Sequence, residues 1–204
     1  MPDFTLEKLV GGVVAGIDEA GRGPWAGPVV AGAVILDAGS LPPELSQGLD
    51  DSKKLKPARR SELFERLREC ARVGVGRAEV DEIDTVNILA ATHLAMGRAC
   101  DALGTIPDVA LVDGNRAPDL PCRVHCAIGG DGLSLSIAAA SIVAKVTRDR
   151  IMADLAKTFP GYGWERNVGY GTAEHRGALE RLGVTPHHRR SFRPIAHILS
   201  QYKE

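Results

Sequence analysis

The sequence contains no apolar run near the roughly 18 residues that a membrane-spanning helix requires. Its first residues, MPDFTLEKLV, lack the long apolar core of a secretory signal. Cysteines are also scarce, with four among 204 residues, and without a secretory signal we expect them to be reduced thiols. No repeat, low-complexity tract or linker interrupts the chain. These absences predict a cytoplasmic protein with one domain, residues 1–204, and no membrane partner.

The chain also lacks a strong charge of either sign, since its formal net charge is −1. The charges are nevertheless unevenly distributed. Residues 1–144 hold 14 Lys and Arg against 20 Asp and Glu, whereas residues 145–204 hold 11 against 6. The basic C-terminal part could face a polyanionic partner or be an ordinary solvated surface, and charge alone does not decide between these two interpretations.

Five short segments rich in Val and Ile, bounded by Gly and Pro, predict strands. They lie at 13–18, 29–36, 72–80, 109–114 and 123–128. Apolar residues at helical spacing predict helices at 57–70, 84–103, 137–159 and 172–183. Three strands come first, and helices and strands alternate afterwards. This order predicts an α/β fold, with a mixed five-stranded sheet flanked by helices and a helical C-terminal part from about residue 160.

Two adjacent acids, Asp18 and Glu19, stand where the first predicted strand ends. Neighbouring side chains of a strand face opposite sides of the sheet, so we expect the chain to bend here and aim both acids at one site. Gly21 and Gly23 would permit that bend. Two carboxylates at the end of a buried strand would cost free energy without a partner, so this pair is difficult to explain as ordinary surface residues.

Two further acids stand at comparable places. Asp113 ends another predicted strand, and Asp131 directly precedes a predicted helix. Asp131 could be only a helix N-cap and Asp113 only part of a turn. If all four acids meet at one edge of the sheet, they raise one another's pKa. Divalent cations that prefer oxygen ligands, Mg²⁺ or Mn²⁺, would relieve that repulsion.

The chain resembles the ribonuclease HII family over nearly its whole length. The matching stretches, in order, are GIDEAGRGPWAGPVVAGAVIL, DSKKL, VDGN, SIAAASIVAKVTRDR, FPGYGW, GYGTAEH and HRRSF. The resemblance implies an RNase H-like fold and hydrolysis of the RNA strand of RNA–DNA hybrids. It also implies nicking on the 5′ side of ribonucleotides embedded in duplex DNA, leaving 5′-phosphate and 3′-hydroxyl ends.

The resemblance further implies the roles of individual residues. Asp18, Glu19, Asp113 and Asp131 match the family's catalytic set, which holds two Mg²⁺ or Mn²⁺ ions, with Asp18 touching both. The turn Gly21-Arg22-Gly23 matches the main-chain segment that contacts the ribose 2′-hydroxyl. Tyr170 matches the tyrosine that stacks on the sugar 3′ of the cut. Without the resemblance, Gly21-Arg22-Gly23 would be interpreted as a plain tight turn and Tyr170 as an ordinary surface residue.

One hydroxyl residue and five basic residues are the remaining candidates for the site, as contacts to substrate phosphates. They are Ser52, Lys53, Lys54, Arg189, Arg190 and Arg193. Lys145 and Arg148 could join them or form ion pairs along a helix with Asp149 or Asp154. We interpret Cys122 and Cys126 as core thiols, because no second pair of ligands completes a zinc site.

Three other functions remain open. Ribonuclease HIII carries an additional N-terminal domain, for which this chain leaves no room before Asp18. A resolvase-like nuclease of the same fold would also use clustered acids. A non-catalytic protein that binds hybrids would not need four intact acids. We expect a monomer.

Overall fold

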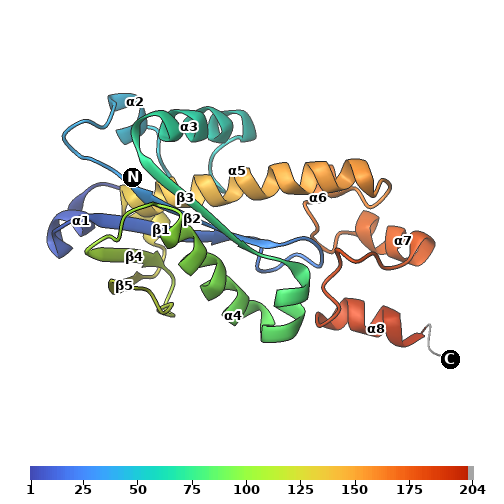
Figure 1. The fold of residues 1–204 in the computed structure, drawn as a ribbon. Coiled ribbons are helices and arrows are strands. Elements are labelled where there is room, and N and C mark those ends of the chain that lie inside the picture. The colour runs from blue at the N-terminus through green and yellow to red at the C-terminus, as the bar shows by residue number, and fades with distance from the viewer. Residues whose placement is uncertain (202–204) are drawn as a thin grey trace.

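The computed structural model of the protein describes residues 1–201 and contains one five-stranded sheet with the strand order β3-β2-β1-β4-β5 (Figure 1). The strands are β1 (Val14–Ala20), β2 (Val29–Ile35), β3 (Arg72–Ala78), β4 (Val109–Asp113) and β5 (Arg123–Ala127). The first three pair antiparallel, whereas β4 pairs parallel with both β1 and β5. The predicted mixed sheet, with all five strands, is confirmed.

Helices cover both faces of this sheet (Figure 1). α5 packs on β1 and β2 with α3 against it, and α4 lies over β3 and β2 on the other face. The helices are α1 (Thr5–Val10), α2 (Pro43–Ser46), α3 (Pro57–Cys70), α4 (Val80–Asp101), α5 (Leu135–Thr158), α6 (Trp164–Asn167), α7 (Ala173–Leu182) and α8 (Arg193–Gln201), with a 3₁₀ turn η1 (Gly130–Gly132). None of those within residues 1–201 combines the length and hydropathy that a bilayer-spanning segment needs.

Alternation along β1 assigns its side chains to the two faces. Ala15 and Ile17 are fully buried in the cluster under α4. Gly16 points the other way, where a Cβ would lie 2.0 Å from the carbonyl carbon of Ser136 in α5. Residues 138–141 of α5 are Ala, Ala, Ala and Ser, all of them buried, and a Cβ on Gly32 of β2 would lie 2.5 Å from the Ala140 carbonyl oxygen, so α5 comes equally close to the second strand. The prediction that this small-residue face packs tightly on the sheet is confirmed.

Two helix starts differ from the sequence prediction. α4 begins at Val80 rather than near residue 84, because Glu79 and Glu82 form a capping box at its N-terminus. The N-cap of α5 is Ser134, whose side chain accepts a hydrogen bond from the Ile137 N–H. The interpretation of Asp131 as that cap is therefore wrong, and its carboxylate is free for another role.

The cysteines belong to the body of the fold. Within the described residues all four are free thiols. Cys122 and Cys126 pack against the hydrophobic cluster beneath α4, as expected of core thiols. Burial and the neighbouring Cys122 raise the pKa of Cys100 to about 11, which leaves it as a neutral thiol at physiological pH.

Candidate active site

The four acids come from three segments that end at one edge of the sheet. β1 and β4 are parallel neighbours paired up to Ile17 and Val112, so Asp18 and Asp113 follow directly on adjacent strands. Asp113 Oδ1 accepts a hydrogen bond of 2.7 Å from the Gly130 N–H, which ties the η1 turn and its Asp131 to this edge. Asp18 is 6% exposed and Asp131 8% exposed, so the edge forms a partly enclosed acidic site.

The expected bend at Asp18 and Glu19 does not occur, and that prediction is wrong. β1 stays paired with β2 through Asp18–Gly32, Glu19–Ala31 and Ala20–Val30. The side chains of Asp18 and Glu19 therefore point to opposite faces of a regular strand. Both can still reach a site at the same edge of the sheet, because the pairing of β1 with β4 ends one residue before Asp18. Beyond that point no neighbouring strand separates the two faces.

Burial and mutual repulsion dominate the electrostatics of this edge. Burial, with the carboxylates of Glu19 and Asp113, raises the pKa of Asp18 well above its ordinary value. Burial and Asp113 also raise the pKa of Glu19, although Arg22 opposes the shift. Burial, Asp51 and Asp113 raise the pKa of Asp131. These carboxylates therefore need a positive counter-charge to be ionised together.

The chemistry of this donor set fits hard divalent cations, since every candidate ligand is a carboxylate oxygen. Three of the acids are held by hydrogen bonds: Asp18 by the Glu19 N–H (2.7 Å), Asp113 by the Gly130 N–H, and Glu19 by Arg22 (3.2 Å). Within residues 1–201 no three acidic, histidine or cysteine side chains already surround one point at metal-ligand spacing. Binding an ion would therefore require these side chains to turn.

The loop that carries Ser52, Lys53 and Lys54 lies against the acidic edge. Although partial burial opposes it, the carboxylates of Asp51, Asp131, Asp18 and Asp113 raise the pKa of Lys53. Lys53 therefore faces the site, whereas Lys54 pairs with Asp50 at 3.1 Å. Ser52 is buried and receives a hydrogen bond of 2.8 Å from the hydroxyl of Ser141 in α5, which anchors the loop but hides this hydroxyl from a phosphate.

Two residues of this region have contacts that the sequence analysis did not assign. Asp51 contributes to the raised pKa of Asp131, which makes it a fifth acid beside the site. Arg60 of α3 donates to the carbonyls of Ser52 (2.9 Å) and Leu55 (2.5 Å) and so holds the loop from behind. Asp51 could have been suspected from its place in the DSKKL stretch; nothing local in the sequence marks Arg60.

The Gly21-Arg22-Gly23 turn lies beside Tyr170. A Cβ on Gly23 would lie 3.4 Å from the ring carbon Cε1 of Tyr170, a residue that is 49% exposed. Gly21 has φ +97°, and a Cβ there would lie 2.0 Å from Nε of Arg148. Only glycine fits at that position. The turn and the tyrosine thus form one exposed surface next to the acidic edge.

The C-terminal basic residues divide into buried and exposed groups. Arg189 is fully buried and binds backbone carbonyls, so the expected phosphate contact is wrong for it. Arg148 is also buried and binds carbonyls, while Lys145 pairs with Asp149 at 2.6 Å. Arg190 and Arg193 are exposed.

A buried histidine pair supports the loop that carries Tyr170. His175 Nδ1 contacts the Tyr170 carbonyl (2.9 Å), and its Nε2 lies 3.0 Å from His188 Nε2. His188 Nδ1 accepts from the Thr185 N–H (2.9 Å). Because the carbonyl only accepts and the Thr185 N–H only donates, both rings are neutral, and His188 donates to His175. Burial and His175 lower the pKa of His188 to about 3.

This pair predicts a loss of stability in acid. The folded-state pKa of His188 lies below the ordinary value of 6.5. The contribution of neutral His188 to stability is therefore complete above pH 6.5 and is lost as the pH falls towards 3. We expect His188 alone to lower the free energy of unfolding by about 1.4 kcal/mol per pH unit within this window. Urea denaturation between pH 7 and about 4 measures this slope. The variant His188→Gln keeps the donor to His175 and removes the titration, so equal slopes in both proteins would contradict the prediction.

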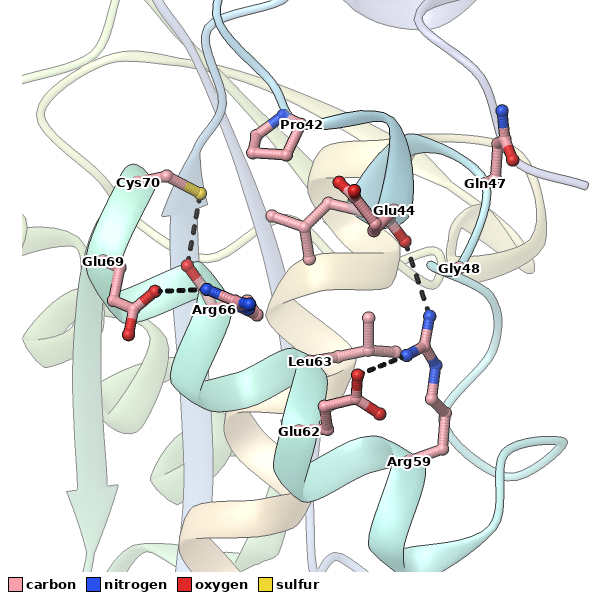
Figure 2. A pocket seen from close by; sticks show the side chains of 11 residues that line it. Pro42, Glu44, Gln47, Gly48, Arg59, Glu62, Leu63, Arg66, Glu69 and Cys70 are labelled. Atoms are coloured by element: carbon pink, nitrogen blue, oxygen red, sulfur yellow. Dashed lines mark hydrogen bonds and ion pairs between the residues drawn. The ribbon is translucent and has the colours of Figure 1, made fainter.

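A cavity of about 600 Å³ lies elsewhere, between α2 and α3. Its walls include Leu45, Leu63 and Cys70, and none of the predicted site residues lines it. Figure 2 shows four of its charged side chains in two pairs, Arg59 with Glu62 and Arg66 with Glu69, at 2.8 and 3.1 Å. It lacks the convergent acids of the sheet edge, which remains the candidate active site.

Comparison with known proteins gives one consistent result. The family model described as Ribonuclease HII matches residues 15–195. A Ribonuclease HII from Paramagnetospirillum magneticum is 65% identical over 196 residues, covering 96% of this chain and 98% of the relative. The crystal structure of ribonuclease H2 from Pyrococcus horikoshii OT3 has a TM-score of 0.78 at 28% identity, covering 94% of this chain and 99% of that one. Bst-RNase HIII in complex with Mn²⁺ shares the fold, with a TM-score of 0.74 at 19% identity, covering 100% and 74%.

Proposed function

Because the chain belongs to the ribonuclease HII family, whose members are type 2 ribonucleases H, we propose that it also nicks DNA on the 5′ side of embedded ribonucleotides. The proposal covers two substrates, the RNA strand of RNA–DNA hybrids and duplex DNA that contains single ribonucleotides. It leaves a 5′-phosphate and a 3′-hydroxyl. The observation that carries it is the meeting of the acidic edge with the exposed turn and Tyr170.

Asp18, Glu19, Asp113 and Asp131 would hold the cofactor, which we propose is a pair of Mg²⁺ or Mn²⁺ ions. When bound, these ions supply Lewis acidity to the attacking water and to the leaving 3′ oxygen. The raised pKa of Asp18 supports this assignment, because a buried carboxylate among other carboxylates gains most from a cation. No side chain is needed as a nucleophile, since the acids hold and orient the ions.

Recognition of the substrate would fall to the residues around this edge. The Gly21-Arg22-Gly23 turn would contact the 2′-hydroxyl, a group that both donates and accepts hydrogen bonds and is absent from DNA. The Tyr170 ring would stack on the next sugar, where deoxyribose offers no hydroxyl to obstruct it. Lys53, Arg190 and Arg193 would contact phosphates, so binding should weaken as salt is added.

We propose further that the sheet and the helical C-terminal part act as one catalytic unit. The Trp25 N–H donates to the Gly169 carbonyl (2.8 Å) and the Arg189 N–H to the Trp25 carbonyl (2.8 Å), which joins the two parts beside the site. With no partner chain needed to complete the site, we propose a monomer. Free thiols and a chromosomal substrate support a cytoplasmic location.

Product mapping tests this function. The substrate is a DNA duplex with one ribonucleotide, incubated separately with Mg²⁺ and with Mn²⁺, and the ends are identified by their charge and by ligation. We expect a single nick on the 5′ side of the ribonucleotide. Cleavage of long hybrids alone would favour a ribonuclease HIII-like enzyme, cleavage of branched DNA a resolvase, and binding without turnover a non-catalytic protein.

Replacing Tyr170 with alanine should impair cleavage at RNA-to-DNA junctions much more than binding of the hybrid. Stacking of a ring on a nucleotide contributes about 1–3 kcal/mol, which corresponds to a loss of roughly 5- to 150-fold at the junction. Steady-state cleavage of both substrates and filter binding give the three values. Tyr170→Phe, which keeps the ring, is the control. Equal losses on junction and hybrid would contradict the assigned role.

A further inference from the structure

Every donor of the Arg189 guanidinium that the structure places in a hydrogen bond points at the carbonyls of one loop. Nη1 donates to the Arg22 carbonyl (2.9 Å) and Nη2 to the Gly21 carbonyl (2.6 Å). Nε and Nη2 both donate to the Gly27 carbonyl, at 2.9 and 2.8 Å. The side chain is fully buried, and among residues 1–201 it has no carboxylate within ion-pair distance. A buried cation whose only partners are carbonyls is costly. The four contacts hold three carbonyls of the loop in fixed directions.

The direction of these carbonyls also sets the direction of the N–H groups that follow them in the turn. In a trans peptide the C=O of one residue and the N–H of the next point in opposite directions, and the described residues contain no cis peptide. Arg189 holds the carbonyls of Gly21 and Arg22 towards the interior. The N–H groups of Arg22 and Gly23 must therefore point away from it. Both residues are exposed, and within residues 1–201 neither N–H donates to another backbone carbonyl.

We propose that Arg189 is a positioning residue for recognition of the ribose 2′-hydroxyl, because it fixes the two carbonyls that aim the Arg22 and Gly23 N–H groups at the nucleotide. This inference rests on the proposed function of the same turn. The side chain does not touch the substrate, since the loop lies between them. Burial and Arg148 lower the pKa of Arg189 to about 9, with Asp84 opposing, so it remains cationic at neutral pH.

A second buried arginine supplies a matched control. Arg148 of α5 donates to the carbonyls of Pro28 (3.0 Å), Ala26 (3.1 Å) and Val168 (3.0 Å). It is as buried as Arg189, packs against Gly21 and also binds carbonyls of the same loop, but it donates to neither of the two carbonyls of the turn. Loss of Arg148 should therefore cost stability without reorienting the Arg22 and Gly23 N–H groups.

The experiment compares the full-length protein with its Arg189→Lys and Arg148→Lys variants. The substrates are two DNA duplexes, one with a single ribonucleotide and one with a 2′-fluoro-2′-deoxyribonucleotide at the same place. The measured quantity is the ratio of the two kcat/KM values, which does not depend on the fraction of enzyme that is folded. We expect the ratio to fall at least about tenfold in Arg189→Lys, equivalent to one lost hydrogen bond, and to stay within about twofold in Arg148→Lys.

An unchanged ratio in Arg189→Lys, or an equal fall in both variants, would overturn the inference. If the unaltered protein itself does not distinguish the two duplexes, the proposed function of the turn fails instead. Should Arg189→Lys give no folded enzyme, NMR on the unaltered protein decides. We expect slow exchange of the Arg189 guanidinium protons and fast exchange of the Arg22 and Gly23 amides, and the reverse pattern would refute the role.

Discussion

Replacing Asp18 with asparagine is expected to reduce cleavage by about 10³-fold or more while the fold and hybrid binding persist. Asp18 is the most buried of the four acids, and Glu19 and Asp113 both raise its pKa. An amide presents one oxygen and no charge, so the proposed cation site would lose its central ligand. Metal assistance contributes several kcal/mol to catalysis of this kind, which corresponds to the stated loss.

The same variant should be more stable than the unaltered protein when divalent ions are removed. The folded-state pKa of Asp18 is raised, so its contribution favours folding below the ordinary pKa of about 3.8 and is lost as the pH rises through the folded value. At pH 7, which lies above its ordinary pKa, the Asp18 carboxyl group therefore opposes folding, and its replacement should increase the free energy of unfolding by about 0.5–2 kcal/mol. The difference should disappear in acid.

Single-turnover cleavage with Mg²⁺ and urea denaturation in EDTA measure the two effects. Asp154→Asn is the matched control, since Asp154 lies on α5 with an exposed side chain paired to Lys157. We expect this control to cleave normally. Near-normal turnover of Asp18→Asn would exclude the acidic edge as the active site, and lower stability in EDTA would contradict the electrostatic account.

Replacing Gly16 with alanine is expected to destabilise the fold by about 3 kcal/mol, the upper part of the usual range for overpacking. The new Cβ would lie 2.0 Å from the Ser136 carbonyl carbon and 2.3 Å from the Ile137 nitrogen. These are backbone atoms of α5, which no rotamer change can move aside. For a protein of this size we expect the melting temperature to fall by about 6–12 °C.

Gly97→Ala is the matched control for this substitution. Gly97 lies inside α4, and a Cβ there would meet no atom within 4 Å. Alanine at a helical glycine should instead stabilise by about 0.5–1 kcal/mol. Thermal denaturation of the two variants therefore gives shifts of opposite sign. A similar melting temperature for Gly16→Ala and the unaltered protein would mean that α5 does not pack on β1 as closely as the structure shows.

Local patterns in the sequence contain much of the fold. The strand-forming runs predict all five strands, and helical spacing predicts α3, α5 and α7 to within about two residues. The short helices α1 and α2 were not predicted, because at six and four residues they carry little periodicity. The helices α6 and α8 were covered only by the general prediction of a helical C-terminal part from about residue 160. α4 was placed late because its capping glutamates precede the apolar pattern.

The candidate acids were proposed from the sequence, because two adjacent carboxylates at the end of an apolar strand have no ordinary structural explanation. How they meet was not predictable. The sequence analysis placed a bend at Asp18, whereas the structure keeps β1 extended and ends its pairing with β4 instead. Where pairing ends depends on the neighbouring strand, β4, which lies about 90 residues further along the chain.

The sequence by itself determined the strands, most of the long helices, the candidate oxygen-only donor set and the family, because residue type and spacing are local properties of the chain. Only the tertiary structure decided which charged groups are buried and which are exposed. Arg189 and Arg190 are neighbours in sequence, yet one is fully buried against loop carbonyls and the other is exposed. The direction of a side chain depends on distant segments that pack around it, so no local pattern records it.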